Sequence, residues 1–218
     1  MSRLLCVMTV AVAAMLFAAP VSALPVVWPV NGHAYEFVAA APMTWCQARG
    51  AATVRTYGAD HGYLATLTSA EENQFVRDNV LPSQSNDKSL WAGGFQHPNG
   101  IEPSQGWGWI TGESWVYTSW YPGEPNESTS PSCQSDYLNI SLNPPTYGGW
   151  NDACFDDGSI IGYVVEYGGA GDSGGLVECQ SPAYGVPALT NWGRAVLALC
   201  LCLGGALALV RRRARMPR

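Results

Sequence analysis

Apolar residues first recur at helical spacing between positions 44 and 58. Thr44 followed by Gln47 fits a capping box, in which a hydroxyl and an amide side chain satisfy each other's backbone N–H groups at a helix start. We therefore predict a helix that begins near Trp45 and ends near Gly58. Its buried face would carry Trp45, Ala48 and Ala52.

A second helix is predicted to begin at Ala70. Ser69 followed by Glu72 again fits a capping box. The helix would bury Phe75 and end before Pro82, because proline has no N–H group to continue the helical hydrogen bonds.

Short segments rich in aromatic residues, separated by Gly, Pro and Asn turns, fill much of the remaining chain. One strand is predicted at residues 63–67, and others are predicted around Trp91, Trp109, Tyr117, Tyr137 and Val164. Two helices followed by antiparallel strands indicate an α+β domain. The roughly 160 residues between the terminal apolar segments are enough for one domain with its own core.

The first 23 residues have the pattern of a secretory signal peptide. Arg3 precedes an apolar run, and residues 21–23 read Val-Ser-Ala, a small-residue cleavage site. We therefore exclude residues 1–23, with Cys6, from the fold. Export implies an oxidising compartment in which disulfides persist.

A second apolar run, residues 195–210, is followed by a basic tail with five arginines. Sixteen helical residues at about 1.5 Å each fall short of a roughly 30 Å hydrocarbon core. Trp192 and a snorkelling Arg194 can extend the span. We predict a transmembrane helix whose arginines remain in the cytoplasm.

Residues 186–193 read Val-Pro-Ala-Leu-Thr-Asn-Trp-Gly. They resemble the start of a proteobacterial C-terminal sorting signal that begins Ile-Pro-Thr-Leu, with conservative departures at Val186 and Ala188. The resemblance assigns residues 186–218 to that signal. It implies a Gram-negative protein exported through the inner membrane, then anchored there or directed to the cell surface after C-terminal processing. A plain membrane anchor is the alternative.

The charge distribution argues against nucleic acid as a partner. All 17 acidic residues lie between Glu36 and Glu178, where only Arg49, Arg55, Arg77 and Lys88 are basic, so this region has a formal charge of 4 minus 17, or −13. Such a surface repels phosphate backbones. It is compatible with cation binding or with a plain solvated surface.

Oxygen-bearing side chains are concentrated between residues 120 and 152. Residues 120–126 read Trp-Tyr-Pro-Gly-Glu-Pro-Asn, and residues 149–152 read Gly-Trp-Asn-Asp. Calcium takes about six to eight oxygen ligands, which paired carboxylates and carboxamides supply, and no nitrogen or thiolate cluster competes with this interpretation. Residues i and i+2 of an extended segment face the same way. Glu124 and Asn126 can therefore face one point, and together with Asn151 and Asp152 they are the candidate ligands.

At these residues the chain resembles the C-type lectin-like domain family. The resemblance covers residues 32–167 and includes, in the family's order, Leu-Trp-Ala-Gly-Gly at 90–94, Trp-Gly-Trp at 107–109, Glu-Pro-Asn at 124–126, Trp-Asn-Asp at 150–152 and Gly-Tyr-Val-Val-Glu-Tyr at 162–167. It implies two helices, antiparallel sheets and a long loop region that carries the site. It also implies one calcium ion, held by those four ligands, on which two hydroxyls of a mannose-type sugar complete the coordination.

One departure from the family pattern concerns a further acidic ligand. The family has Glu-Asp before a Cys or Tyr, whereas residues 135–137 read Ser-Asp-Tyr here. Ser135 cannot replace a carboxylate, and Glu127 and Asp136 are the alternatives for that position. We include Asp136 among the candidate metal ligands.

Four cysteines remain in the exported region: Cys46, Cys133, Cys154 and Cys179. Four cysteines allow three connectivities. The resemblance implies a bridge from Cys154 to the long loop, with Cys133 as its partner. It also suggests Cys46 with Cys179 as a displaced second bridge, unless those two remain free or pair between chains.

The tryptophans at positions 91, 107, 109, 115, 120 and 150 are assigned to the core, as most of them are in the family. Tyr121 and Tyr147 are the aromatic candidates for solvent exposure near the site. Aromatic rings offer broad apolar surfaces on which a sugar can stack.

Residues 171–175 read Gly-Asp-Ser-Gly-Gly, the nucleophile motif of chymotrypsin-like proteases. They lie in a Gly-rich stretch, residues 168–185, that we predict to be a linker. No histidine lies in that family's His motif, and a serine without a base is not activated. We therefore expect no enzyme, but an exported, calcium-dependent carbohydrate-binding domain. The alternative is a calcium-independent protein-binding or adhesion domain that uses the same loop surface.

Overall fold

The computed structural model describes residues 24–127 and 133–174. The predicted signal peptide and the predicted sorting signal, with its transmembrane segment 195–210, lie outside these residues. Within the described ranges, no helix is both long and apolar enough to cross a membrane.

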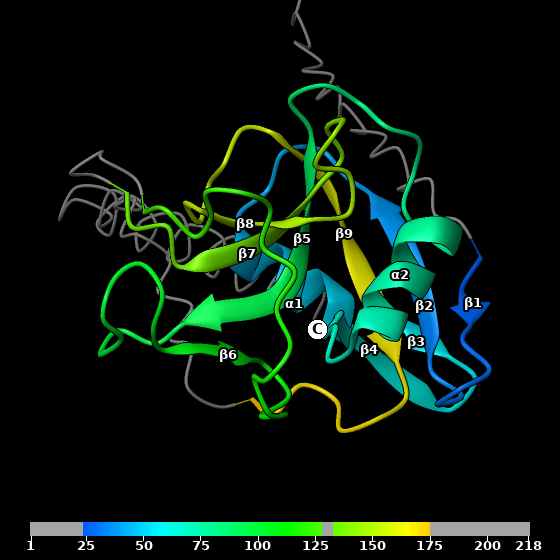
Figure 1. The fold of residues 1–218 in the computed structure, drawn as a ribbon. Coiled ribbons are helices and arrows are strands. Elements are labelled where there is room, and N and C mark those ends of the chain that lie inside the picture. Colours follow the sequence, from blue (N-terminus) through cyan, green and yellow to red (C-terminus); the bar gives the residue numbers. More distant parts are fainter. Residues whose placement is uncertain (1–23, 128–132, 175–218) are drawn as a thin grey trace, which may run out of the picture. The chain divides into compact units, whose positions relative to one another are not determined.

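One mixed sheet organises the domain (Figure 1). Its central path runs β1-β2-β9-β5-β7-β8, while β4 also pairs with β9, β3 with β4 and β6 with β5. The β5–β9 pairing is parallel and the others are antiparallel. The elements are β1 (Val26–Val27), β2 (Ala34–Ala39), α1 (Trp45–Thr53), β3 (Thr56–Tyr57), β4 (Asp60–Leu64), α2 (Ala70–Asn79), β5 (Ser89–Gln96), β6 (Trp107–Trp109), β7 (Tyr137–Ser141), β8 (Trp150–Ala153) and β9 (Ile160–Tyr167).

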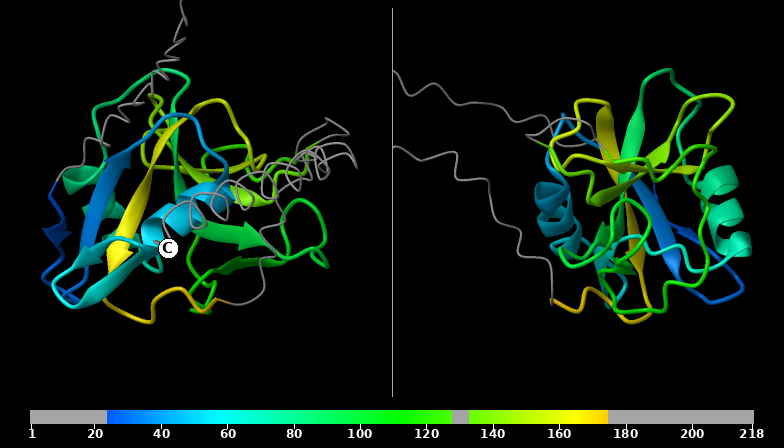
Figure 2. Two further views of the ribbon diagram at one scale, coloured as in Figure 1. Left: turned by 180° about the vertical axis from the view of Figure 1, so that it is seen from behind. Right: turned by 60° about the vertical axis from the view of Figure 1, so that its left-hand side comes forward.

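The two helices cover different sides of this sheet, as Figure 2 shows. Trp45 and Ala52 of α1 belong to one buried cluster, together with Trp91 of β5. Val76 of α2 belongs to a second cluster that contains Trp150 of β8. Each helix therefore buries its apolar stripe against a different sheet face.

Helix α1 begins as predicted but ends early. The Thr44 hydroxyl accepts the Gln47 backbone N–H, and the Gln47 side chain accepts that of Thr44, which completes the capping box. The predicted end near Gly58 is wrong, because Gly58, with φ of 60°, lies in the turn between β3 and β4. The helix therefore ends at Thr53, and the chain turns into a hairpin.

Helix α2 has the predicted bounds but only half of the predicted cap. The Ser69 hydroxyl accepts the Glu72 backbone N–H at 3.1 Å. The Glu72 carboxylate accepts hydrogen bonds from the Thr68 backbone N–H and the Tyr35 hydroxyl. It does not accept the Ser69 backbone N–H, which a complete capping box would require. Glu72 is consequently buried on the helix face where Phe75 was predicted, and Phe75 is only partly buried.

Two strand predictions differ from the structure. The strand predicted at residues 63–67 is β4, which ends at Leu64. Beyond Leu64, the Glu166 carboxylate accepts the Thr66 backbone N–H at 2.9 Å. A side chain therefore takes the place of a strand-to-strand backbone hydrogen bond at Thr66. Tyr117 lies in irregular chain and packs edge-on against Trp150, with ring centroids 5.5 Å apart.

Trp150 joins the site-bearing strand β8 to the core. It is fully buried, and its indole N–H donates to Asn73 of α2 at 2.8 Å. Trp91, Trp107 and Trp109 are also buried, whereas Trp115 and Trp120 are half-buried in the same aromatic cluster. The prediction that these residues form core is confirmed for the four buried tryptophans.

The packed region extends past residues 32–167 at both ends. Strand β1 pairs with β2 before residue 32. After β9, Asp172 forms a two-point ion pair with Arg49, with both N–O distances 2.7 Å. The Ser173 hydroxyl donates to the Ile110 carbonyl at 2.8 Å, which gives this protease-like motif a structural role.

Candidate functional site

The four predicted ligands lie around one open cavity. Glu124 and Asn126 come from the loop that follows Trp120, and Asn151 and Asp152 come from β8. The cavity has a volume of about 570 Å³, and its lining also includes Tyr121, Ser135, Asp156 and Asp157. The structure therefore brings the two carboxylate-carboxamide pairs together, although they are separated by about 26 positions in sequence.

Asp152 fixes the loop that carries the other pair. One of its carboxylate oxygens accepts the backbone N–H of Asn126 at 3.1 Å, and the other accepts that of Glu127 at 2.8 Å. Asp152 is 5% exposed, so these charge-assisted bonds are shielded from water. Each oxygen keeps a further lone pair for another partner.

Glu124 has one carboxylate oxygen without a partner. Its Oε1 accepts the Asn126 side-chain N–H at 2.9 Å, whereas its buried Oε2 has no hydrogen bond to the described residues. Burial, together with the neighbouring Asp152 carboxylate, raises the pKa of Glu124 to about 7. Two carboxylates are held close in a partly buried place, an arrangement that a cation would stabilise.

The Tyr121 side chain hydrogen-bonds directly to one of the predicted ligands, Asn151, which its position in the sequence did not indicate. Its hydroxyl donates to Asn151 Oδ1 at 2.9 Å, and the Asn151 amide donates to the Asp152 carbonyl at 2.8 Å. Burial and the Glu124 charge raise the pKa of Tyr121 to about 12. These two hydrogen bonds orient the Asn151 side chain. The sequence alone did not predict them.

The Glu127 carboxylate lies within hydrogen-bond distance of the Ser135 backbone. Ser135 is buried, and its backbone N–H donates to Glu127 Oε1 at 3.1 Å, while the buried Glu127 Oε2 has no partner among the described residues. Asp136 does not line the cavity. Burial and the Glu127 charge raise the pKa of Asp136. Of the two alternatives for the missing carboxylate, Glu127 is the one that accepts the Ser135 backbone N–H, and neither residue lines the cavity.

The predicted Cys133–Cys154 disulfide is present, with Cα atoms 5.5 Å apart. It joins the long loop to the residue after β8, directly beside the cavity. Cys46 lies on α1, and its predicted partner Cys179 lies outside the described residues, so this second pairing stays a prediction.

The donor set at the cavity fits calcium. All candidate ligand atoms are oxygens, which a hard cation prefers, and one carboxylate oxygen in the cavity lining, Glu124 Oε2, is buried without a hydrogen-bond partner among the described residues. Unpaired buried carboxylate oxygens are costly unless something pairs with them. The Glu124–Pro125 peptide bond is cis.

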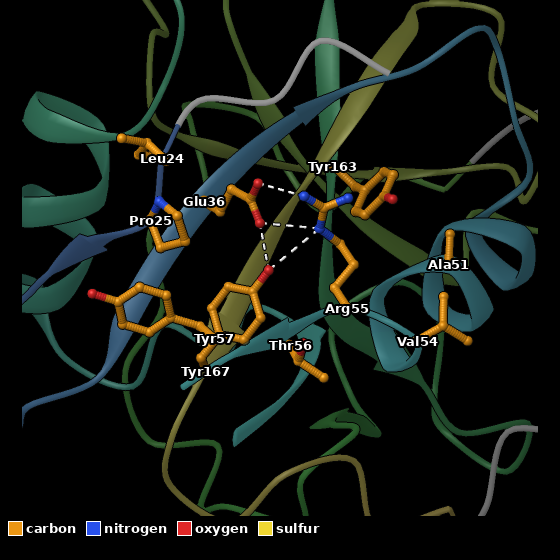
Figure 3. A pocket seen from close by; sticks show the side chains of 10 residues that line it. All are labelled: Leu24, Pro25, Glu36, Ala51, Val54, Arg55, Thr56, Tyr57, Tyr163 and Tyr167. Atoms are coloured by element: carbon orange, nitrogen blue, oxygen red, sulfur yellow. Dashed lines mark hydrogen bonds and ion pairs between the residues drawn. The ribbon is translucent and has the colours of Figure 1, made fainter. Parts of the chain in front are cut away.

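A wider cavity of about 770 Å³ lies between β2, the end of α1 and β9 (Figure 3). The Glu36 carboxylate, the Arg55 guanidinium and the Tyr167 hydroxyl hydrogen-bond one another within it. Because these polar groups satisfy each other, we interpret the network as structural.

Comparisons with known proteins agree with this architecture. No family model matches the chain. Halomucin of Haloquadratum walsbyi (strain DSM 16790 / HBSQ001) is 32% identical over 152 residues, which are 64% of this chain and 1% of halomucin. Lithostathine-1 of Mus musculus is 32% identical over 92 residues, 42% of this chain and 50% of that protein. The chain thus spans half or less of the length of either relative.

Solved structures show the same fold at low sequence identity. Human lithostathine superposes with a TM-score of 0.51 and 19% identity, covering 66% of this chain and 88% of that structure. The C-type lectin CEL-I from Cucumaria echinata superposes with a TM-score of 0.50 and 24% identity, covering 65% and 94%. The chain therefore has the C-type lectin-like fold.

Proposed function

We propose that this domain binds carbohydrate through a calcium ion held by Glu124, Asn126, Asn151 and Asp152. The observation that carries the proposal is the convergence of these four side chains on one open cavity, in which the buried Glu124 Oε2 has no hydrogen-bond partner in the part of the chain that the structure describes. Sugar hydroxyls can accept and donate hydrogen bonds, so they match a site that alternates carboxylates with carboxamides.

The bound ion would supply positive charge and open coordination positions for two neighbouring hydroxyls. Asp152 holds the loop in place through the Asn126 and Glu127 amides, and Tyr121 orients Asn151. Asn126 and Asn151 can donate to hydroxyl oxygens, while Glu124 can accept from a hydroxyl. The Glu-Pro-Asn order supports a mannose-type preference.

The same proposal includes export and presentation at the cell surface. It rests on the sequence patterns of residues 1–23 and 186–218. We infer no protease-like role for residues 171–175, because Ser173 donates to the Ile110 carbonyl and Asp172 pairs with Arg49.

Calcium titration by calorimetry into the chelator-treated chain tests the metal part. We expect dissociation constants in the micromolar to millimolar range, as in sensor and extracellular calcium sites, and a rise in Tm on binding. Glu124→Gln should abolish the binding heat. The matched control is Glu71→Gln, which changes an exposed carboxylate on α2 that does not line the cavity.

Retention on a mannose column tests the sugar part. The wild-type chain should be retained with calcium and released by a chelator, and Asn151→Ala with Asp152→Ala should pass through the column. No binding heat and no Tm shift in the wild-type chain would overturn the calcium proposal. Such a result would favour the protein-binding alternative on the same loop surface.

A further inference from the structure

A second cavity of about 650 Å³ adjoins the candidate calcium site. It lies between α2, the loop at residues 119–122 and the turn between β7 and β8. Its lining includes Arg77, Trp120, Tyr121, Pro145, Tyr147 and Gly149. Tyr121 and Tyr147 were predicted near the site from the sequence, but the proposed calcium site does not account for this cavity.

Tyr121 forms the wall that the two cavities share. A Cβ atom built on Gly149 would lie 3.1 Å from Tyr121 Cβ, which places the start of this side chain on the Gly149 side. Its hydroxyl donates to Asn151 Oδ1 on the calcium side. A ligand that occupied both cavities would therefore contact Tyr121.

The second cavity has the lining expected for a sugar ring. Trp120, Tyr121 and Tyr147 provide aromatic surface, and prolines 122 and 145 add apolar surface. The Tyr147 hydroxyl donates to the Pro82 carbonyl at 2.6 Å, which fixes its ring. A sugar has one relatively apolar face that can lie on such rings, and immobile rings bind at a lower entropic cost.

Among the described residues that line the two cavities, Arg77 is the one basic residue, whereas the first cavity has four carboxylates in its lining. Its aliphatic stem crosses Gly148, because a Cβ built there would lie 2.5 Å from Arg77 Cδ. Only its Nε is paired, with exposed Asp78 at 3.0 Å. Its two terminal amino groups make no hydrogen bond to the described residues, and a guanidinium fork matches carboxylate and sulfate groups.

We propose that this cavity is a second subsite, which binds an acidic sugar unit linked to the sugar at the calcium site. The inference rests on the proposed function and names its ligand class: an oligosaccharide that carries a carboxylate or sulfate on its second unit. The calcium site selects the terminal sugar by its hydroxyls. Arg77 selects the neighbouring unit by its charge.

Four probes in calorimetry with calcium present test the proposal: methyl α-mannoside, a neutral mannobiose, mannose linked to glucuronate, and mannose linked to a sulfated mannose. We expect the acidic disaccharides to bind about tenfold more tightly than methyl α-mannoside, a change that corresponds to roughly 1.4 kcal/mol. The carboxylate and sulfate arms distinguish the two sources of charge. Arg77→Met should remove this gain and leave methyl α-mannoside binding unchanged.

The matched control is Lys88→Met, which removes a basic residue that lines neither cavity and should change nothing. Equal affinity of the wild-type chain for all four probes would overturn the subsite while leaving the calcium site intact. Loss of methyl α-mannoside binding in Arg77→Met would also contradict it. Failure of the wild-type chain to bind methyl α-mannoside would overturn the proposed function itself, and with it this inference.

Discussion

The carboxylate of Asp152 accepts the backbone N–H of Asn126 at 3.1 Å and thereby joins β8 to the loop that carries Glu124. The same carboxylate accepts the Glu127 N–H through its other oxygen. One buried side chain thus holds the two halves of the candidate site together. The conformation of the loop and the relative positions of the candidate ligands therefore both depend on Asp152.

Asp152→Asn should loosen this loop while preserving side-chain volume. An amide cannot accept two N–H groups in the same geometry, and a hydrogen bond to a charged group contributes about 1.5–3 kcal/mol. Amide hydrogen exchange should therefore be at least about tenfold faster at Asn126 and Glu127. Asp156→Asn is the control, because it lines the same cavity. Unchanged exchange in Asp152→Asn would contradict the anchoring role.

Exchanging the two loop ligands should change sugar preference. Glu124→Gln with Asn126→Asp moves the acceptor-only group from one position to the other, so hydroxyls with a different arrangement should be bound. We expect retention to shift from a mannose column towards a galactose column, with calcium affinity largely kept. If the double variant still prefers mannose, the assignment of these two residues as sugar ligands is wrong.

Removing the Cys133–Cys154 disulfide should lower stability without removing any candidate ligand. The bridge closes a loop with a sequence separation of 21 residues, and the chain-entropy account predicts a loss of about 3 kcal/mol. Urea unfolding of the Cys133→Ser, Cys154→Ser double variant measures this. Because the closed loop carries Asn151 and Asp152, calcium affinity should fall as well. The reverse result, full calcium affinity and stability, would show that the loop is held by other contacts.

Stability should fall as the pH rises above about 6.5, the ordinary pKa of histidine. The hydrogen bond to Glu166 raises the pKa of His33, burial opposes this, and the charges of Glu166, Glu72 and Glu113 add to it. Burial also raises the pKa of Glu166. The folded state therefore holds more protons than the unfolded state, so the contribution of His33 is complete below pH 6.5 and is lost as pH rises through its folded pKa.

Thermal unfolding between pH 5.5 and 8.5 checks this sign. His33→Gln should lower Tm more at pH 5.5 than at pH 8.5, whereas His61→Gln, a change at an exposed residue of β4, should not alter the pH profile. An equal loss of Tm in His33→Gln at both pH values would show that the ion pair with Glu166, at 2.7 Å, contributes no proton linkage.

Local signals predicted the helix starts correctly because a cap is decided within four residues. Thr44 and Gln47 close the box that their spacing indicates. The end of α1 depended instead on pairing between β3 and β4, which used Gly58 as a hairpin turn. Likewise, the Glu72 side chain does not make its predicted capping hydrogen bond. Its carboxylate instead accepts a buried hydrogen bond from the hydroxyl of Tyr35, which is 37 positions away in the chain.

The sequence by itself determined that the ligands are oxygen atoms, that they come as two carboxylate–carboxamide pairs, and that a cysteine follows each pair. These properties depend only on residue type and on near neighbours in the chain. Tertiary structure decided that Asp152 anchors the Asn126 amide, that Tyr121 separates two cavities, and that the Glu127 carboxylate accepts the Ser135 N–H. Those relationships join residues between 8 and about 30 positions apart. Their distances depend on how β8 packs against the loop through the buried Trp150, which no local pattern records.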